Sequence, residues 1–386
     1  MNYRNERKII MIQRVFHELS VSGLGMGCMR FPLVNGNNAV VDEVAAGEMI
    51  CTLMEEGVNY YDTAWGYHEG NAEAVMGRLL SPFPRDSYFL ASKFPGYDLN
   101  NMGKVEEIFE EQLRRCQVNH FDFYLFHNVC EANIDHYLDP QYGILDYLLK
   151  QKQAGRIRHL GFSTHGSIPV MERFLDAWGE HIEFCQIQLN WFDWLFQKAD
   201  QKVELLNKRN LPIWVMEPLR GGKLANLPEE FMAKLEAVAP GRTAAEWGMR
   251  FLQGVPGVTV VLSGMSNMAQ ISSNISTFSQ LQPLPEDELT VLMEVAKEMA
   301  AKTSVPCTAC RYCTTHCPME LDIPRLLELY NEFLYSGRTV LPALMISALE
   351  ENKRPASCIG CRSCEAVCPQ EIKISEALAN LNKQVK

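Results

Sequence analysis

Eight of the 13 cysteines in this 386-residue chain stand after position 306, in two short and regularly spaced groups. The other five are scattered over the first half of the chain without a common spacing. In a cytoplasmic protein, regular cysteine groups indicate metal or redox chemistry before they indicate disulfides. We therefore expect the last part of the chain to bind metal.

Both groups read C-x2-C-x2-C-x3-C followed by proline. The two-residue gaps let a tight turn aim three thiolates at one cluster, and the proline directs the chain toward a neighbouring site. Zinc is the alternative, but a Cys₄ zinc site needs only two C-x2-C pairs, so two runs of four cysteines favour two 4Fe–4S clusters. In bacterial ferredoxins, which use this run, each fourth cysteine ligates the other cluster. The expected ligand sets are Cys307, Cys310, Cys313 and Cys368 for one cluster, and Cys358, Cys361, Cys364 and Cys317 for the second.

A second group of residues that could take part in catalysis occurs early in the chain. Asp62 and Tyr67 flank the break from an apolar run into a polar loop, and Lys93 and His127 each end a later apolar run. Taken singly, each residue has a simpler structural interpretation. Asp62 could be a loop cap and Tyr67 a buried phenol, while Lys93 could be a surface cation and His127 a buried histidine. Their joint position at the ends of consecutive strands favours a shared catalytic site.

The elements that must position these residues alternate between apolar strands and helical patterns. We predict strands at 22–28, 58–63, 88–93, 121–127, 159–163, 184–189, 213–217 and 258–262. Helical patterns between them include 42–56, 105–116, 144–153 and 169–177. Eight such units favour parallel pairing and a TIM (β/α)8 barrel. A doubly wound sheet is the alternative, but Gly23-x-Gly25-x-Gly27 lacks the spacing of a dinucleotide-binding loop.

The alternation of strand and helix patterns ends near Gln282-Pro-Leu-Pro285. We predict an α/β barrel domain over 1–285, opening with a short hairpin-like extension, and a C-terminal domain over 286–386. The second domain should be mainly helical, with helices at 286–302, 324–335 and 340–352. Since about 40 residues separate the two cysteine runs, this domain resembles helical dicluster ferredoxin modules more than compact small ferredoxins.

Composition narrows the possible partners. The formal net charge of −11 disfavours nucleic acid or an anionic membrane as the main partner. The N-terminal apolar run is too short for a secretory signal, and no run approaches the roughly 20 residues of a membrane span. We expect a cytoplasmic protein.

Residues 15–280 resemble the aldo-keto reductase superfamily. The segments that carry the resemblance are YDTAWGY, LASKF, DFYLFHN, GFSTHG, QIQLN, MEPLRGG and VVLSGMSN. The first three contain the family's tetrad as Asp62, Tyr67, Lys93 and His127. With the cysteine module, the whole chain resembles the iron–sulfur branch of this superfamily.

The resemblance implies hydride transfer from NAD(P)H to the carbonyl of an aldehyde or ketone. Tyr67 would act as the general acid, because negative charge builds on the carbonyl oxygen. Lys93 would lower the pKa of the phenol from about 10, and Asp62 would hold Lys93 in place. His127 would orient the carbonyl by a hydrogen bond.

The resemblance also implies contacts with the nicotinamide cofactor. The implied contact residues are Ser163, Gln186, Met216, Gly264, Asn267 and Asn274. Met216 replaces the aromatic residue that commonly stacks on the nicotinamide. The cations that often bind an adenosine 2′-phosphate are replaced by Gly264, Ser266 and Gln270. This slightly favours NADH over NADPH, or else indicates weak nicotinamide binding and another electron donor.

Two functions from different classes follow from these patterns. The leading hypothesis is an oxidoreductase acting on a small carbonyl or alcohol, with clusters that exchange single electrons with a ferredoxin or redox partner, or that only stabilise the fold. The alternative is a catalytically weak barrel that serves a partner enzyme as an electron-transfer or redox-sensing subunit. The sequence leaves both open.

Overall fold

The structure is a computed structural model that describes residues 11–307, 309–337 and 339–385. It divides into two compact units. One contains the residues up to Val129 together with Ile134–Met293, and the other contains Cys130–Asn133 together with the residues from Glu294 onward. The division after Met293 falls inside helix α12 (Glu286–Thr303).

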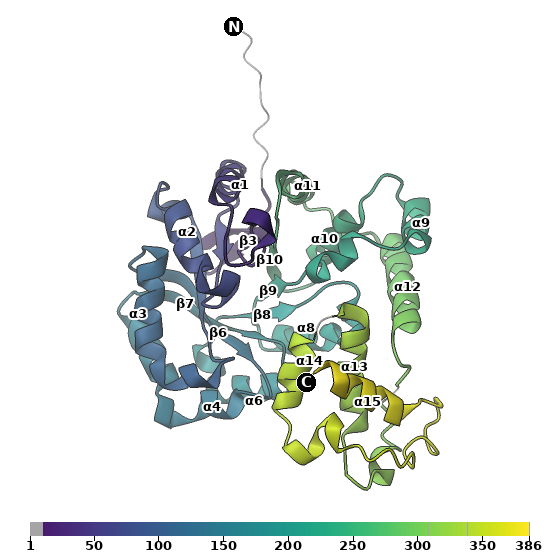
Figure 1. The fold of residues 1–386 in the computed structure, drawn as a ribbon. Coiled ribbons are helices and arrows are strands. Elements are labelled where there is room, and N and C mark those ends of the chain that lie inside the picture. The colour runs from purple at the N-terminus through teal and green to yellow at the C-terminus, as the bar shows by residue number, and fades with distance from the viewer. Residues whose placement is uncertain (1–10, 308, 338, 386) are drawn as a thin grey trace. The chain divides into compact units, whose positions relative to one another are not determined.

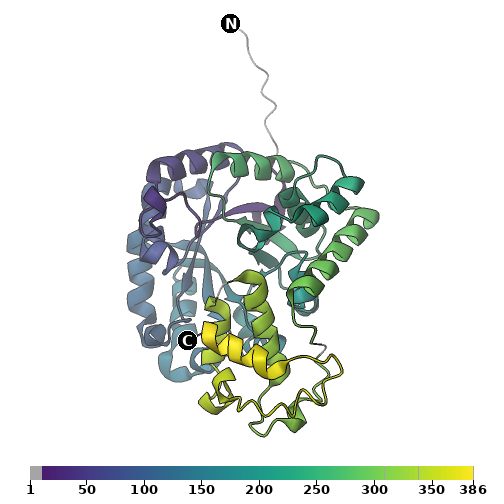
Figure 2. The same cartoon turned by 45° about the vertical axis from the view of Figure 1, so that its right-hand side comes forward.

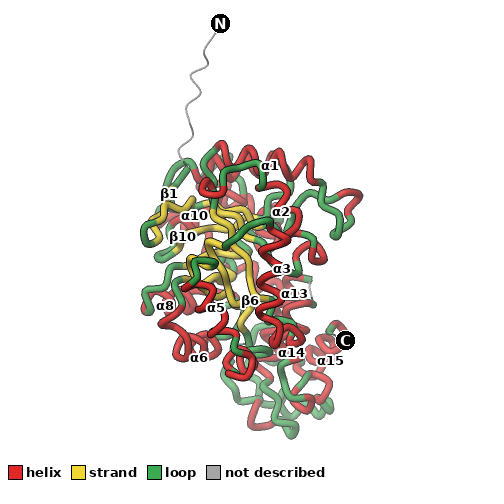
Figure 3. Tube along the Cα trace, turned by 90° about the vertical axis from the view of Figure 1, so that its left-hand side faces the viewer, coloured by secondary structure: helices red, strands yellow, loops and turns green. Residues whose placement is uncertain are grey.

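In the described part of the first unit, eight parallel strands close into a barrel in the order β10-β3-β4-β5-β6-β7-β8-β9 (Figures 1 and 3). The strands are β3 (Leu24–Gly27), β4 (Tyr60–Asp62), β5 (Phe89–Phe94), β6 (Phe121–Val129), β7 (Ile157–Thr164), β8 (Phe184–Gln188), β9 (Ile213–Met216) and β10 (Val258–Ser263). The prediction of a TIM barrel is confirmed, and each predicted strand overlaps an observed one.

Helices lie on the outside of this barrel, as Figure 1 shows for α1, α2 and α3. The helices are α1 (Glu43–Glu55), α2 (Ala72–Leu80), α3 (Val105–Cys116), α4 (Ile134–Leu138), α5 (Ile144–Gln153), α6 (Ile168–Trp178), α7 (Asp193–Phe196), α8 (Ala199–Lys208), α9 (Glu229–Val238), α10 (Ala244–Gln253) and α11 (Met268–Phe278). Their amphipathic sequences bury one face on the strands. In α3, for example, Ile108, Phe109 and Leu113 are buried while the charged residues between them face outward.

A β-hairpin of β1 (Gln13–Phe16) and β2 (Leu19–Ser22) precedes the barrel. Its Phe16 is buried in one cluster with Phe123, Phe184 and Trp214, so the amino-terminal end of the barrel is filled by side chains. Gly25 permits the tight packing of β3, because a Cβ at this position would lie 2.9 Å from side-chain atoms of Val260 and Leu262.

The second unit has its own apolar core, to which α13 (Ile323–Ser336), α14 (Val340–Ser347) and α15 (Ile374–Gln384) contribute. Figure 2 shows α13 and α15 side by side. The predicted helix at 340–352 is too long, since α14 ends at Ser347. After this end, Arg354 donates to Ser347 O at 2.9 Å and to Leu349 O at 3.0 Å. In a longer helix these carbonyl oxygens would accept from backbone N–H groups instead.

Among the described residues, none of the helices combines the length and apolar character that a membrane crossing requires.

Candidate active site

The four tetrad residues meet at the carboxyl end of the barrel strands. Asp62 ends β4, Lys93 lies near the end of β5, His127 lies near the end of β6, and Tyr67 starts the turn after β4. Because the strands are parallel neighbours, these ends share one rim.

Lys93 is the centre of the group. Its Nζ donates to Asp62 Oδ1 at 2.5 Å and to Thr63 O at 2.9 Å, and both Lys93 and Asp62 are buried. The same Nζ lies 5.1 Å from the centre of the Tyr67 ring. The Tyr67 ring in turn meets His127 edge-on, with ring centres 6.2 Å apart. The structure therefore brings all four predicted residues together.

The turn that carries Tyr67 is held by its neighbour. His68 and Glu69 adopt left-handed backbone angles of φ 51° and 55°, which bend the chain sharply after Tyr67. The buried His68 ring is anchored by the Phe31 N–H at 3.4 Å and by the Asn38 carbonyl at 3.0 Å. Both anchors come from the loop after β3, so that loop helps to set the position of the phenol.

Burial controls the protonation states in the site. Burial lowers the pKa of Lys93, but Asp62 and Tyr67 beside it outweigh that effect and raise the pKa above its ordinary value. Burial and the charge of Lys93 hold the pKa of His127 well below its usual range, so its imidazole is neutral at pH 7. The pKa of Tyr67 is raised, because burial outweighs the lowering effect of Lys93.

This last point differs from the expectation that Lys93 makes Tyr67 a stronger acid than a free phenol. A raised pKa keeps the hydroxyl protonated in the resting site, which is the form that can donate. The charge of Lys93 still favours the phenolate form of Tyr67, and therefore stabilises Tyr67 after its hydroxyl has lost the proton.

Tyr97, in the loop after β5, is a second phenol that the sequence did not single out. Its ring lies edge-on to His127 at 5.1 Å, and burial, followed by Tyr67, raises its pKa to about 12. A Cβ on Gly66 would lie 2.4 Å from the Tyr97 hydroxyl, so Gly66 is needed for this close packing. The sequence carries no spacing signal for Tyr97, because it lies beyond the strand end.

A buried polar network supports Lys93 from the helix side. Gln112 of α3 donates to the backbone carbonyl of Lys93 at 3.0 Å and to Glu73 of α2 at 2.6 Å. Glu73 also accepts from Ser92 at 2.6 Å, and Tyr124 donates to the Gln112 carbonyl oxygen at 2.6 Å. These contacts fix the backbone of β5 at the point where Lys93 projects into the site.

The first three predicted cofactor residues occupy neighbouring strands of the same rim. Ser163 on β7 pairs in register with Gln186 on β8, and Met216 ends β9. The Ser163 hydroxyl already accepts from the Asn128 N–H at 2.9 Å. Within the described residues, buried Gln186 Oε1 has no hydrogen-bond partner, and it is therefore an acceptor that a carboxamide could use.

The other predicted cofactor residues lie around the start of α11. Asn267 caps this helix, because its side-chain oxygen accepts from Gln270 N at 3.0 Å. The amino terminus of a helix is the kind of site that binds phosphate. Asn274 is buried and donates to Ser263 Oγ at 3.0 Å. A Cβ on Gly264 would meet the methylene stem of Arg30 at 2.9 Å, so the side chain of a residue that the sequence did not single out packs against this loop.

The eight clustered cysteines line two hollows in the second unit. One hollow is lined by Cys307, Cys310, Cys313 and Cys368. The other is lined by Cys317, Cys358, Cys361 and Cys364. Each hollow thus gathers the four thiols of one expected ligand set, including one from the opposite run. Burial and then neighbouring thiols raise the pKa of Cys313, and burial and then Glu365 raise that of Cys364, each to about 11. A compensating cation would favour the thiolate form of Cys313 and Cys364, which fits iron–sulfur ligation.

Comparisons with known proteins agree with this description. The model of the aldo/keto reductase family matches residues 23–297, and that of a 4Fe-4S dicluster domain matches residues 306–374. An uncharacterized oxidoreductase of Bacillus subtilis, YqkF, is 23% identical over 73% of this chain and 94% of its own length. The L-galactose dehydrogenase of Arabidopsis thaliana is 24% identical over 71% of this chain and 89% of its own.

Solved structures share the fold of the barrel. The holo form of an aldo-keto reductase from Bacillus halodurans covers 74% of this chain and 96% of its own, with a TM-score of 0.61 and 24% identity. An aldo/keto reductase from Klebsiella pneumoniae, solved with NADP and acetate, covers 74% of this chain and 95% of its own, with a TM-score of 0.60 and 21% identity. The chain is an oxidoreductase with an iron–sulfur domain, and it belongs to the aldo/keto reductase family.

Proposed function

We propose that this protein reduces the carbonyl group of a small aldehyde or ketone to an alcohol, with NAD(P)H as the hydride donor. The observation that carries the proposal is the buried Lys93–Asp62 ion pair beside Tyr67 and His127 on one rim. The reduced nicotinamide supplies the hydride when it is bound.

The side chains of the rim would supply the remaining chemistry. Neutral His127 donates a hydrogen bond that holds the carbonyl oxygen next to the Tyr67 hydroxyl. As negative charge builds on that oxygen, Tyr67 gives up its proton to it. Lys93 stabilises the resulting phenolate, and Asp62 keeps the ammonium group in place.

We propose that Ser163, Gln186 and Met216 flank the nicotinamide, and that Gly264, Asn267 and Asn274 hold the adenosine end. NADH is slightly favoured, because Gly264, Ser266 and Gln270 offer no charge to a 2′-phosphate. The comparisons leave this choice open, since a 23% identical Escherichia coli relative is named an NADH-specific methylglyoxal reductase and the Klebsiella structure contains NADP.

We further propose that residues 286–386 form a domain with two 4Fe–4S clusters, attached to a barrel domain of residues 1–285. Cys310 and Cys361 are exposed, which would bring the clusters close enough to the surface to exchange electrons with a ferredoxin or another redox protein. Cysteines kept as thiolate ligands suit a reducing compartment, so we place the protein in the cytoplasm.

The decisive experiment compares wild type with Tyr67→Phe after anaerobic purification. Wild type should oxidise NADH or NADPH in the presence of some members of a panel of aldehydes and ketones. The variant should keep its fold and nicotinamide binding but lose turnover by at least about 10²-fold, since one positioned acid contributes typically 10²–10⁴.

The matched control is Tyr97→Phe, because this substitution removes a neighbouring phenol without touching Lys93. Near-normal turnover by Tyr67→Phe would exclude Tyr67 as the acid. Wild type that reduces no carbonyl with either nicotinamide, but turns over with a reduced ferredoxin, would favour the electron-transfer subunit instead.

A further inference from the structure

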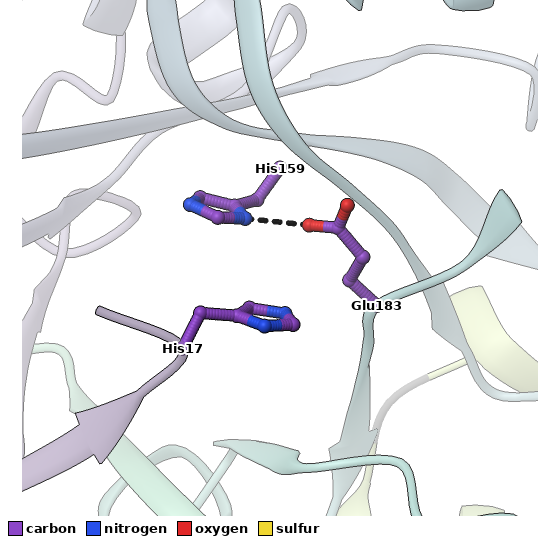
Figure 4. A group of neighbouring side chains, drawn as sticks. All are labelled: His17, His159 and Glu183. Atoms are coloured by element: carbon purple, nitrogen blue, oxygen red, sulfur yellow. Dashed lines mark hydrogen bonds and ion pairs between the residues drawn. The ribbon is translucent and has the colours of Figure 1, made fainter. Parts of the chain in front are cut away.

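A group of metal-ligating side chains lies at the opposite end of the barrel from the tetrad. His17 is in the turn between β1 and β2, His159 lies near the start of β7, and Glu183 directly precedes β8. All three belong to the barrel unit, and Figure 4 shows them facing one another. The proposed carbonyl chemistry uses none of them.

Their donor atoms already lie close together. One nitrogen from each histidine and one carboxylate oxygen are all within 4.8 Å of one another. His159 Nδ1 and Glu183 Oε2 are 2.5 Å apart. The His17 ring stacks on the His159 ring, with centres 5.4 Å apart and planes 6° from parallel.

Two of the three ligands are held in place by their surroundings. The His159 ring is packed edge-on against Phe16 at 5.0 Å and tilted against Phe123 at 5.2 Å. Lys152 forms an ion pair with Glu183 Oε1, so that the other oxygen faces His159. His17 is exposed in its turn, and only its stacking on the His159 ring and its edge-on contact with Phe16 are seen among the described ring contacts.

We propose that His17, His159 and Glu183 form a binding site for a divalent cation of the Zn²⁺ type. Two imidazoles and one carboxylate are a known ligand set for zinc, with the fourth position left to water or another small ligand. A cavity of about 450 Å³, lined by His17 and Glu183 among others, provides space for that ligand.

The required movements are small. At metal–ligand distances of about 2.0–2.2 Å, two tetrahedral ligand atoms lie about 3.4 Å apart. His159 and Glu183 must therefore separate by less than about 1 Å as the metal replaces the proton between them. The bound cation would tie the β1–β2 hairpin to strands β7 and β8, which stabilises the amino-terminal end of the barrel.

The test measures Zn²⁺ binding to the full-length, cluster-loaded protein under anaerobic conditions, by calorimetry against a competing chelator. His17→Asn removes the imidazole but keeps a residue that tolerates the left-handed φ of 50° at this position. His181→Ala is the matched control, because His181 lies near Glu183 in sequence but outside the group.

Wild type and His181→Ala should bind one Zn²⁺ that raises the unfolding temperature of the barrel. His17→Asn should bind it at least tenfold more weakly and lose the temperature shift. Equal affinity in wild type and His17→Asn, or an equal loss in His181→Ala, would overturn the site. Carbonyl turnover without added zinc should be the same in all three proteins, so this result is independent of the proposed function.

Discussion

Burial is the main influence on the pKa values of the individual side chains in the rim. Burial keeps His127 neutral at pH 7, and it also keeps neutral His165, which directly follows β7 and whose pKa it lowers to about 4. A neutral His127 can donate one hydrogen bond without adding a second positive charge beside Lys93. Burial of Tyr67 has the complementary effect of keeping its hydroxyl protonated.

These two histidines predict how stability depends on pH. Their folded pKa values lie below the unfolded value of about 6.5, so below that pH the unfolded chain binds protons that the folded chain does not. Stability should therefore fall as the pH drops below about 6.5, by up to about 1.4 kcal/mol per pH unit for each histidine. Denaturant unfolding of wild type and His165→Gln across this range measures the effect. The variant should have the shallower slope, and parallel slopes would contradict the prediction for His165.

Arg30 provides a test of coenzyme choice. Its side chain packs over Gly264, and its carbonyl accepts from the Ser266 hydroxyl at 2.7 Å. If the Arg30 guanidinium binds the 2′-phosphate of NADPH, Arg30→Ala should weaken NADPH binding about tenfold and NADH binding by less than about twofold. Fluorescence titration with both coenzymes, using Arg173→Ala as a remote control, distinguishes this from a contact with the shared pyrophosphate, which would weaken both equally.

At the level of elements, helices α2 and α3 do more than cover the barrel. They place Glu73 and Gln112 against β5, where the pair fixes the backbone of Lys93. A buried network of this kind orders its strand only while every member keeps a partner.

Glu73→Leu should therefore impair both stability and turnover. It leaves the Ser92 hydroxyl without its acceptor and removes one of the acceptors of the Gln112 amide. A buried group left unsatisfied in this way costs about 1–3 kcal/mol. Glu73→Gln retains an acceptor oxygen and should keep most of both properties. Thermal unfolding together with kcat for the two variants checks this. A Glu73→Leu protein with full kcat at a temperature where it is folded would show that the network does not position Lys93.

Most strands were predictable because they are short apolar runs that end in polar residues, and this also revealed Asp62, Lys93 and His127. Tyr97 and Arg30 were not, because both lie in loops whose paths depend on tertiary packing. The network of Glu73 and Gln112 was missed for a similar reason, since residues on two helices meet only after the helices dock. The pKa of Tyr67 was misjudged because the sequence indicates its neighbours but not the extent of its burial.

At the level of the whole molecule, the residues of the tetrad and the clustered cysteines come from separate parts of the sequence. The tetrad lies in the barrel unit, and the clustered cysteines lie in the second unit. In the second unit, each hollow draws Cys317 or Cys368 from the opposite run.

Iron content of cysteine variants tests this exchange. If the proposed two 4Fe–4S clusters hold roughly eight iron atoms, Cys317→Ala should lose about half of the iron, and so should Cys361→Ala. Because both residues line the same hollow, the double variant should lose no more iron than either single variant. Combining Cys317→Ala with Cys310→Ala should remove both clusters. Additive loss in the first double variant would mean that each run keeps its own fourth cysteine.

The exchanged cysteines also set an order of events during synthesis. The hollow that uses Cys307, Cys310 and Cys313 cannot be completed until Cys368, in the second run, has been translated. The early run must therefore wait on the ribosome with three thiols and no fourth ligand, while the barrel sequence has already been made. A chain truncated before Cys368 would hold all four thiols of the other hollow alone.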